Sequence, residues 1–342
     1  MDVFDLARSL VDQYEGFSRS FATIRSADIK AQIDSEYASR RFWPEPVIQI
    51  NPEYKSGASV DELVDDGILH PGCGDIFRGW TLRHHQQLAA QFGAEGKDFI
   101  VTTGTGSGKS LCFFIPIISA ALSARSGGTR KTRAIIVYPM NALANSQQEE
   151  LAKYFAGQPE HLQVSYARFT GQESEQDRRY IADNPPDILL TNFVMLELLM
   201  TRQDEVDRKV IENCEGLSTL VLDELHTYRG RQGADVAMLV RRLRRRLAPT
   251  GLQCIGTSAT MTSDDRPEKT VSKVASKLFA CEIPASRVIT ERLERRTDPT
   301  LTALSVSGRL ADAIKAPIDE HASNAELASH PVAIWIETVL GV

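Results

Sequence analysis

The sequence has few cysteines and no long apolar run. Its five cysteines include no C-x-x-C pair and have no histidine at metal-ligand spacing: Cys73, Cys112, Cys214, Cys254 and Cys281. Such a scattered, odd-numbered set predicts reduced thiols in a cytoplasmic protein. The longest apolar run, residues 111–122, contains Pro116 and is far shorter than the roughly 20 residues of a membrane span. The first residues lack the basic and apolar regions of a signal peptide, so we expect no membrane partner.

An excess of positive charge is also lacking. The 342 residues carry 39 Lys and Arg against 45 Asp and Glu, a net charge of -6. Any contact with nucleic acid must therefore come from a local basic patch. The hydrophobic share of 42% and the charged share of 25% are typical of a globular protein. The length suggests roughly two domains.

Residues 1–75 are predicted to form a small, mainly helical accessory domain. Helical periodicity runs through residues 3–21 and continues over residues 24–37. Prolines then interrupt the pattern. A short helix is expected after Ser59, with Ser59 as its N-cap and Glu62 completing a capping box.

From about residue 80, short apolar strands alternate with amphipathic helices. The predicted strands are 98–102, 133–138, 164–169, 187–191, 219–223 and 252–258. The predicted helices are 109–124, 142–155, 177–182, 194–201 and 234–247. This alternation predicts an α/β domain over residues 76–282 with a central parallel sheet flanked by helices. Ligands of such sheets bind at the carboxyl ends of the strands. Residues 283–342 are predicted to be a mainly helical linker or the start of a downstream region.

One glycine-rich segment, TGTGSGKS, lies between a predicted strand and a predicted helix. It matches the phosphate-loop pattern G-x-x-x-x-G-K-[ST] except that Thr103 replaces the first glycine. We expect ATP to be held by the whole segment: Thr103, Gly104, Thr105, Gly106, Ser107, Gly108, Lys109 and Ser110. Lys109 would reach the β- and γ-phosphates, and the Ser110 hydroxyl would ligate Mg²⁺.

Two further motifs follow buried strands. In LVLDELHTYRG, Asp223 would hold Mg²⁺ and Glu224 would orient and deprotonate the attacking water. In GTSAT, small hydroxylated residues would bridge the hydrolysis site to neighbouring loops: Ser258, Ala259 and Thr260.

The order of these motifs resembles that of superfamily 2 helicases, whose motifs I, II and III are matched by TGTGSGKS, DELH and SAT. In that superfamily the first loop position is commonly a small residue other than glycine, so Thr103 fits. The resemblance implies a RecA-like P-loop fold. It also implies that Gln86 in LRHHQQLA contacts adenine and that His226 belongs to the coupling residues. It further implies strand-binding residues at Pro139, Asn141, Ala142, Thr170, Gly171, Thr191 and Asn192.

The longer segments YPMNALANSQ and DELHTYRGRQGADVAMLVRRLRRR resemble a bacterial and fungal branch of DNA helicases and translocases of DNA repair and phage defence. Motifs IV, V and VI, which belong to a second RecA-like domain, have no counterpart in the 342 residues. The arginine finger of motif VI is worth about 10³ to 10⁵ in rate in related enzymes. We therefore expect a nucleic-acid-dependent ATPase that is weakly active alone, with DNA and a second RecA-like domain as partners.

Two alternatives stay open. The chain could be an ATP-binding assembly or nucleic-acid-binding subunit without productive turnover, although the intact Asp223–Glu224 pair argues against it. It could also be the translocating subunit of a restriction system, which shares motifs I to III.

The arginine-rich segment MLVRRLRRRL predicts a helix with two distinct faces. Leucines at four-residue spacing would face the sheet, and the arginines would face outward: Arg241, Arg242, Arg244, Arg245 and Arg246. A solvated face is favoured over a contact with nucleic acid.

Overall fold

The computed structural model describes residues 3–21, 23–39, 42, 53–124, 130–259, 267–316 and 322–339. The chain divides into two compact units, one of residues 53–294 and one of residues 1–52 with 295–342.

The larger unit is built on a seven-stranded sheet in which all neighbouring strands are parallel. In spatial order the strands are β10 (Val288–Thr290), β4 (Phe99–Thr102), β9 (Gln253–Ser258), β8 (Thr219–Leu222), β5 (Ala134–Tyr138), β7 (Ile188–Asn192) and β6 (Tyr166–Phe169). The predicted α/β fold with a central parallel sheet is confirmed, and each of the six predicted strands is present with its ends shifted by two residues at most.

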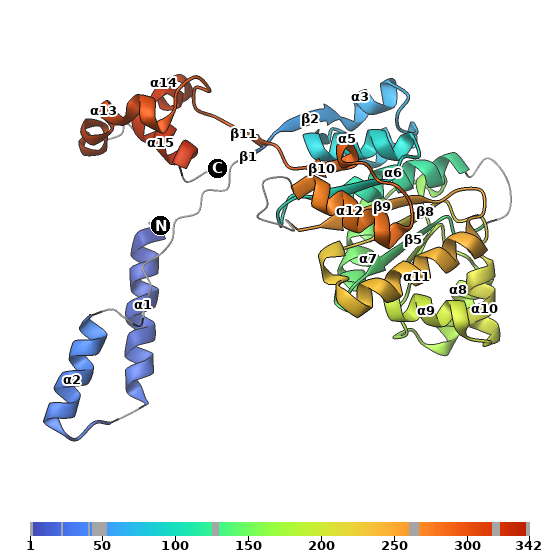
Figure 1. Cartoon of the computed structure of the whole chain (residues 1–342), viewed down its shortest axis with the longest axis horizontal. Helices are drawn as coiled ribbons and strands as arrows, with labels where there is room; N and C mark the ends of the chain where they lie inside the picture. The colour runs from blue at the N-terminus through green and yellow to red at the C-terminus, as the bar shows by residue number, and fades with distance from the viewer. Residues whose placement is uncertain are drawn as a thin grey trace. The chain divides into compact units, whose positions relative to one another are not determined.

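Helices cover both faces of this sheet (Figure 1). Successive strand residues point to opposite faces, so Phe99 and Val101 join one apolar core while Ile100 joins the other. The first core is covered by α5 (His84–Ala94), α6 (Lys109–Ala124) and α7 (Asn141–Phe155). The second is covered by α8 (Glu175–Asp183), α9 (Phe193–Thr201), α10 (Glu205–Glu212), α11 (Gly230–Leu247) and α12 (Pro267–Phe279).

The unit with the sheet extends further in both directions than the predicted range of 76–282. On the N-terminal side, β2 (Ser56–Ser59) pairs antiparallel with β3 (Thr81–Arg83), and α3 (Val60–Asp65) and α4 (Gly72–Ile76) pack on the first core. The capping box of Ser59 and Glu62 is confirmed. On the C-terminal side, β10 adds an edge strand, and β11 (Leu293–Glu294) pairs with β1 (Glu53–Tyr54). These strands of two to four residues are too short to give a periodic pattern.

The other unit is helical in its described parts. It comprises α1 (Val3–Ser20), α2 (Ala27–Ala38), α13 (Ala303–Lys315), α14 (Asn324–Ser329) and α15 (Pro331–Val339). An ion pair between Arg19 and Asp34 joins α1 to α2. Within the described residues, no helix combines the length and the apolar character needed to cross a membrane.

Candidate active site

The phosphate loop and the Asp-Glu pair follow β4 and β8, and the S-A-T segment begins at the last residue of β9; these three strands are adjacent. The register pairs Thr102 with Ser258 and Leu222 with Gly256. Because all three strands are parallel, their carboxyl ends lie at one edge of the sheet. The structure therefore brings together three motifs that span more than 150 residues of sequence.

The phosphate loop is closed by its own hydroxyl groups. The Thr103 and Ser107 side chains share a hydrogen bond of 2.6 Å, and both are buried. A glycine at position 103 could not make this bond. Gly106 and Gly108 have φ angles of 78° and 74°, which glycine adopts at little cost. A Cβ on Gly108 would lie 2.5 Å from Gln86 Nε2.

The loop directs its lysine inward at the start of α6. The Lys109 ammonium group donates hydrogen bonds to the backbone oxygens of Thr103 (3.0 Å) and Gly104 (3.4 Å). Ser110 lies in the first turn of the same helix. The backbone N–H groups of a helix start and its positive dipole end favour phosphate, so these residues fit the triphosphate of a nucleotide.

Side chains from the start of α5 hold the loop from a second side. Gln86 Nε2 donates to the Gly108 oxygen at 3.1 Å, and Arg83 Nη1 donates to the Gly106 oxygen at 3.0 Å. His85 Nε2 lies 2.9 Å from the Ser107 oxygen. Burial lowers the pKa of His85, so we expect a neutral ring that donates from Nε2. Because both ends of the Gln86 amide are bonded within the protein, its contact with adenine stays a prediction.

The Asp-Glu pair is held by a threonine that sequence reasoning missed. The buried Thr257 hydroxyl donates to Asp223 Oδ1 and accepts from the Glu224 backbone N–H at 3.1 Å. Burial raises the pKa of Asp223 to about 6, with Glu224 adding to the rise and Thr257 and Lys109 opposing it. A carboxyl with such a pKa gains from a nearby divalent cation, as expected of a Mg²⁺ ligand.

His226 joins the second motif to the third. Its Nδ1 lies 3.2 Å from Glu224 Oε2 and 3.3 Å from the Ser258 hydroxyl. Glu224 has a left-handed backbone with φ of 52°, which is uncommon outside glycine. It precedes the short 3₁₀ turn η3 (Leu225–Thr227), which carries His226.

Ser258 also contacts the phosphate loop, because its backbone oxygen accepts from the Thr103 N–H at 3.3 Å. The Ala259 oxygen lies 3.5 Å from the Thr102 hydroxyl. Thr260 lies outside the described residues.

A glutamate beyond the third motif also reaches the loop. Glu291 directly follows β10, and its Oε2 accepts a hydrogen bond of 2.8 Å from the Gly104 N–H. Sequence reasoning could not find this contact without the edge strand β10.

The predicted strand-binding residues lie at or just after the carboxyl ends of β5, β6 and β7, which are neighbours in the sheet. Asn192 connects them, because its Nδ2 donates to Asn141 Oδ1 at 2.7 Å and to the Thr170 oxygen at 3.0 Å. Thr191 is fully buried and donates to the Phe169 oxygen, so it can act only by positioning its neighbours. Of the remaining residues, Ala142 and Gly171 are exposed and Pro139 is half-buried.

The loop with Thr170 and Gly171 is shaped by Glu173, which is not among the predicted site residues. Its carboxylate accepts from the backbone N–H groups of Thr170 (2.7 Å) and Gly171 (2.9 Å) and from Arg168 Nε (2.8 Å). Burial raises the pKa of Glu173, but the bonds from the Thr170 backbone and the Arg168 guanidinium outweigh it and leave the pKa below its ordinary value.

The arginine-rich helix is α11. Its leucines are buried as predicted, and four of the five arginines of the segment MLVRRLRRRL are exposed. The outward prediction is wrong for Arg244, which is half-buried and donates to Cys254 Sγ (3.3 Å) and the Phe279 oxygen (3.2 Å). Arg244 lies on the side of α11 that packs against the neighbouring α12. Arg242 pairs with Glu197 of α9. These contacts favour a structural role for both residues.

Comparisons with known proteins agree with this geometry. The family model of the DEAD/DEAH box helicases matches residues 83–267. The uncharacterized ATP-dependent helicase YprA of Bacillus subtilis is 29% identical over 189 residues, which cover 55% of this chain and 23% of that protein. The Druantia protein DruE of Escherichia coli is 25% identical over 343 residues, covering 66% of this chain and 18% of that protein.

A crystal structure of the DUF1998 helicase MrfA, bound to DNA and AMPPNP, aligns with 89% of this chain and 43% of that one, with a TM-score of 0.58 and 22% identity. The matched part of this chain spans about a fifth of the length of YprA and of DruE. The matched family model covers more than half of the chain and includes the phosphate loop, the Asp-Glu pair and the S-A-T segment. The chain therefore belongs to the DEAD/DEAH box helicase family.

Proposed function

We propose that this chain is the first RecA-like motor domain of an ATP-dependent DNA helicase or translocase. The observation that carries the proposal is the set of contacts around Ser258, whose side chain meets His226 beside Glu224 and whose backbone meets Thr103 of the phosphate loop. This arrangement connects the residues that would hold phosphate to the residue that would activate water.

In this proposal the nucleotide site is formed by the phosphate loop and the carboxyl end of β8. Lys109 and the loop N–H groups would neutralise and orient the β- and γ-phosphates. Ser110 and Asp223 would hold Mg²⁺, which supplies positive charge to the leaving phosphates. Glu224 would accept the proton of the attacking water. Gln86 would contact adenine after exchanging one of its present hydrogen bonds.

DNA is proposed as the nucleic acid because the matched MrfA structure is a DNA complex. The loops after β5, β6 and β7 would hold one strand through Asn141, Ala142, Gly171 and their backbone groups. Their hydrogen bonds through Asn192 make them one surface. A second RecA-like domain would close on this unit to move the strand and to supply the arginine finger.

The test is steady-state ATP hydrolysis by the 342-residue chain, with and without single-stranded DNA. We expect weak turnover that Lys109→Ala abolishes and that Lys153→Ala, which removes an exposed lysine of α7, leaves unchanged. Glu224→Gln should retain ATP binding and lose turnover. Glu212→Gln, which removes an exposed carboxylate of α10, should retain both. ATP binding with no turnover in any variant would favour a subunit that holds ATP for assembly.

A further inference from the structure

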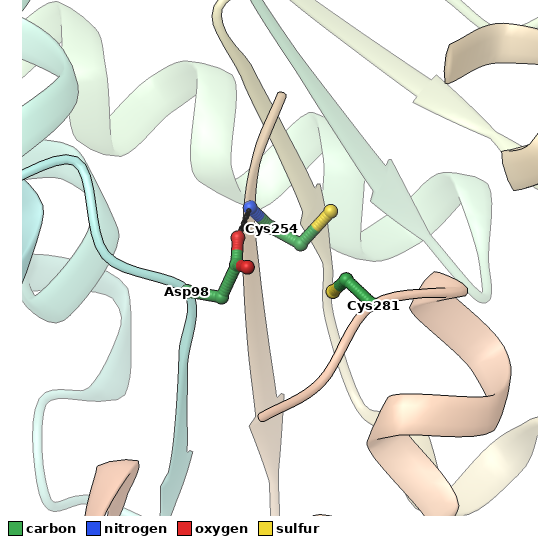
Figure 2. Close-up of side chains that lie close together, drawn as sticks. All are labelled: Asp98, Cys254 and Cys281. Atoms are coloured by element: carbon green, nitrogen blue, oxygen red, sulfur yellow. Dashed lines mark hydrogen bonds between the residues drawn. The ribbon is translucent and has the colours of Figure 1, made fainter. Parts of the chain in front are cut away.

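Three side chains of residue types that can ligate a metal meet at the sheet edge opposite the phosphate loop (Figure 2). Asp98 directly precedes β4, Cys254 is the second residue of β9, and Cys281 follows the end of α12. One ligand atom from each lies within 4.8 Å of the others. Because β4 and β9 are parallel, their amino ends share an edge of the sheet. The two cysteines looked isolated in the sequence, and only the fold brings them together.

The cluster is partly fixed in place and partly open. The Cys254 backbone N–H donates to Asp98 Oδ1 at 2.7 Å, which orients the carboxylate (Figure 2). Cys254 is fully buried, whereas Asp98 and Cys281 are half-buried. An ion could therefore enter from the side of Cys281, and solvent could complete its coordination.

The charges at the cluster fit a divalent cation. Two thiolates and a carboxylate carry three negative charges, and Zn²⁺ would leave one of them uncompensated. Arg244 supplies the missing positive charge, since its guanidinium already donates to Cys254 Sγ at 3.3 Å. Such an outer contact to a ligand sulfur is typical of protein metal sites.

We propose that Asp98, Cys254 and Cys281 form a zinc-binding site that joins β4, β9 and the segment after α12. Zinc takes thiolate and carboxylate ligands in a tetrahedral arrangement, with Zn–S distances of about 2.3 Å. Ligand atoms in such an arrangement lie roughly 3.5 to 3.8 Å apart, so small side-chain rotations bring this cluster into range. The fourth ligand is a water molecule. Bound zinc would fasten the amino end of the strand that carries the phosphate loop at its other end.

The test is zinc binding by the reduced, metal-free 342-residue chain, measured by competition with a chromogenic chelator. We expect one zinc ion per chain, with an affinity reduced at least about tenfold in Cys281→Ser and in Asp98→Asn. Cys214→Ala removes a thiol outside the cluster and should bind zinc like the unchanged chain. Cys254→Ser should also weaken zinc binding. If that variant fails to fold because Cys254 is buried, the variants at the half-buried Asp98 and Cys281 decide the test.

Two further readouts identify the ligands. Replacement by Co²⁺ should give a thiolate-to-metal charge-transfer band that Cys281→Ser weakens, and zinc should raise the melting temperature of the unchanged chain but not of Cys281→Ser. The proposal is overturned if the reduced chain binds no stoichiometric zinc. It is equally overturned if Cys281→Ser and Asp98→Asn bind zinc as tightly as the unchanged chain, or if the cobalt form shows no thiolate band.

Discussion

The backbone N–H of Gly104 donates a hydrogen bond of 2.8 Å to the carboxylate of Glu291, although 187 residues separate the two in the sequence. A negative charge thus lies against the loop that would receive the phosphates of ATP. Anions near the N-terminus of a helix are favoured there, so the carboxylate and the nucleotide would compete for the same positive end.

Removing that charge should strengthen nucleotide binding. We expect Glu291→Gln to lower the dissociation constant of a fluorescent ATP analogue about three- to tenfold, with a smaller difference at high salt because screening weakens the repulsion. Glu282→Gln removes an exposed carboxylate that precedes β10 and adjoins Cys281, at the edge of the sheet opposite the phosphate loop, and should leave the constant unchanged. Equal or weaker binding by Glu291→Gln would show that the carboxylate supports the loop rather than competing with phosphate.

Thr257 should matter to turnover through its hydroxyl alone. Thr257→Val keeps the shape but leaves Asp223 and the Glu224 N–H without their shared partner. We expect a loss of about 1 to 3 kcal/mol in the free energy of unfolding and at least a tenfold lower ATPase rate. Thr257→Ser, which keeps the hydroxyl, should stay within a few-fold of the unchanged chain. Similar rates for the serine and valine variants would contradict this role.

Gly108 should be irreplaceable for two separable reasons. In Gly108→Ala the new Cβ meets Gln86 at 2.5 Å and the φ of 74° is strained, whereas Gly67→Ala has a similar φ of 71° with nothing within 4 Å. Both variants should lose about 1 kcal/mol of stability from the backbone. Only Gly108→Ala should also lose ATP binding, measured by equilibrium titration. Normal ATP binding by Gly108→Ala would mean that Gln86 moves away freely.

Glu173 should give the chain a specific dependence on pH. Its folded-state pKa lies below the ordinary value of 4.5, so its contribution to stability is present above about pH 4.5 and is lost as the pH falls through the folded-state pKa. Glu173→Gln should therefore cost about 1 to 2 kcal/mol at pH 7 and progressively less below pH 4.5, in urea unfolding curves.

The exposed Glu175 offers the control for this prediction, since its carboxylate forms an exposed ion pair with Arg179 on the same helix. Glu175→Gln should change the free energy of unfolding by less than about 0.5 kcal/mol, both at pH 7 and at pH 3. A Glu173→Gln deficit that stays constant from pH 7 to pH 3 would refute the assignment. Glu173→Gln should also weaken binding of single-stranded DNA, because the backbone N–H groups of Thr170 and Gly171 lose the carboxylate that accepts from both.

The sequence predicted the elements whose pattern is long or whose motif is local. The six strands of four to six residues and their helices carry strong apolar periodicity, and the phosphate loop is a continuous segment. Thr257, Glu291 and the cluster around Cys254 could not be predicted in this way. Each depends on which strands become neighbours in the sheet, and β10 is only three residues long.

Arg244 was misassigned for a related reason. Periodicity places it beside the exposed arginines of its helix, but the neighbouring α12 covers that side of the turn. A hydrophobic pattern on one helix cannot show what a second helix will cover.

Strand β4 carries the phosphate loop, and both of its neighbours, β9 and β10, come from much later in the chain. During synthesis the phosphate loop therefore emerges from the ribosome long before β9 and β10 have been made. Pairings of such long sequence separation form slowly, so the part of the sheet around the phosphate loop is the last to be completed during synthesis. Until residue 290 has emerged, one edge of β4 stays unpaired, and its backbone N–H and C=O groups are open to pairing with another strand.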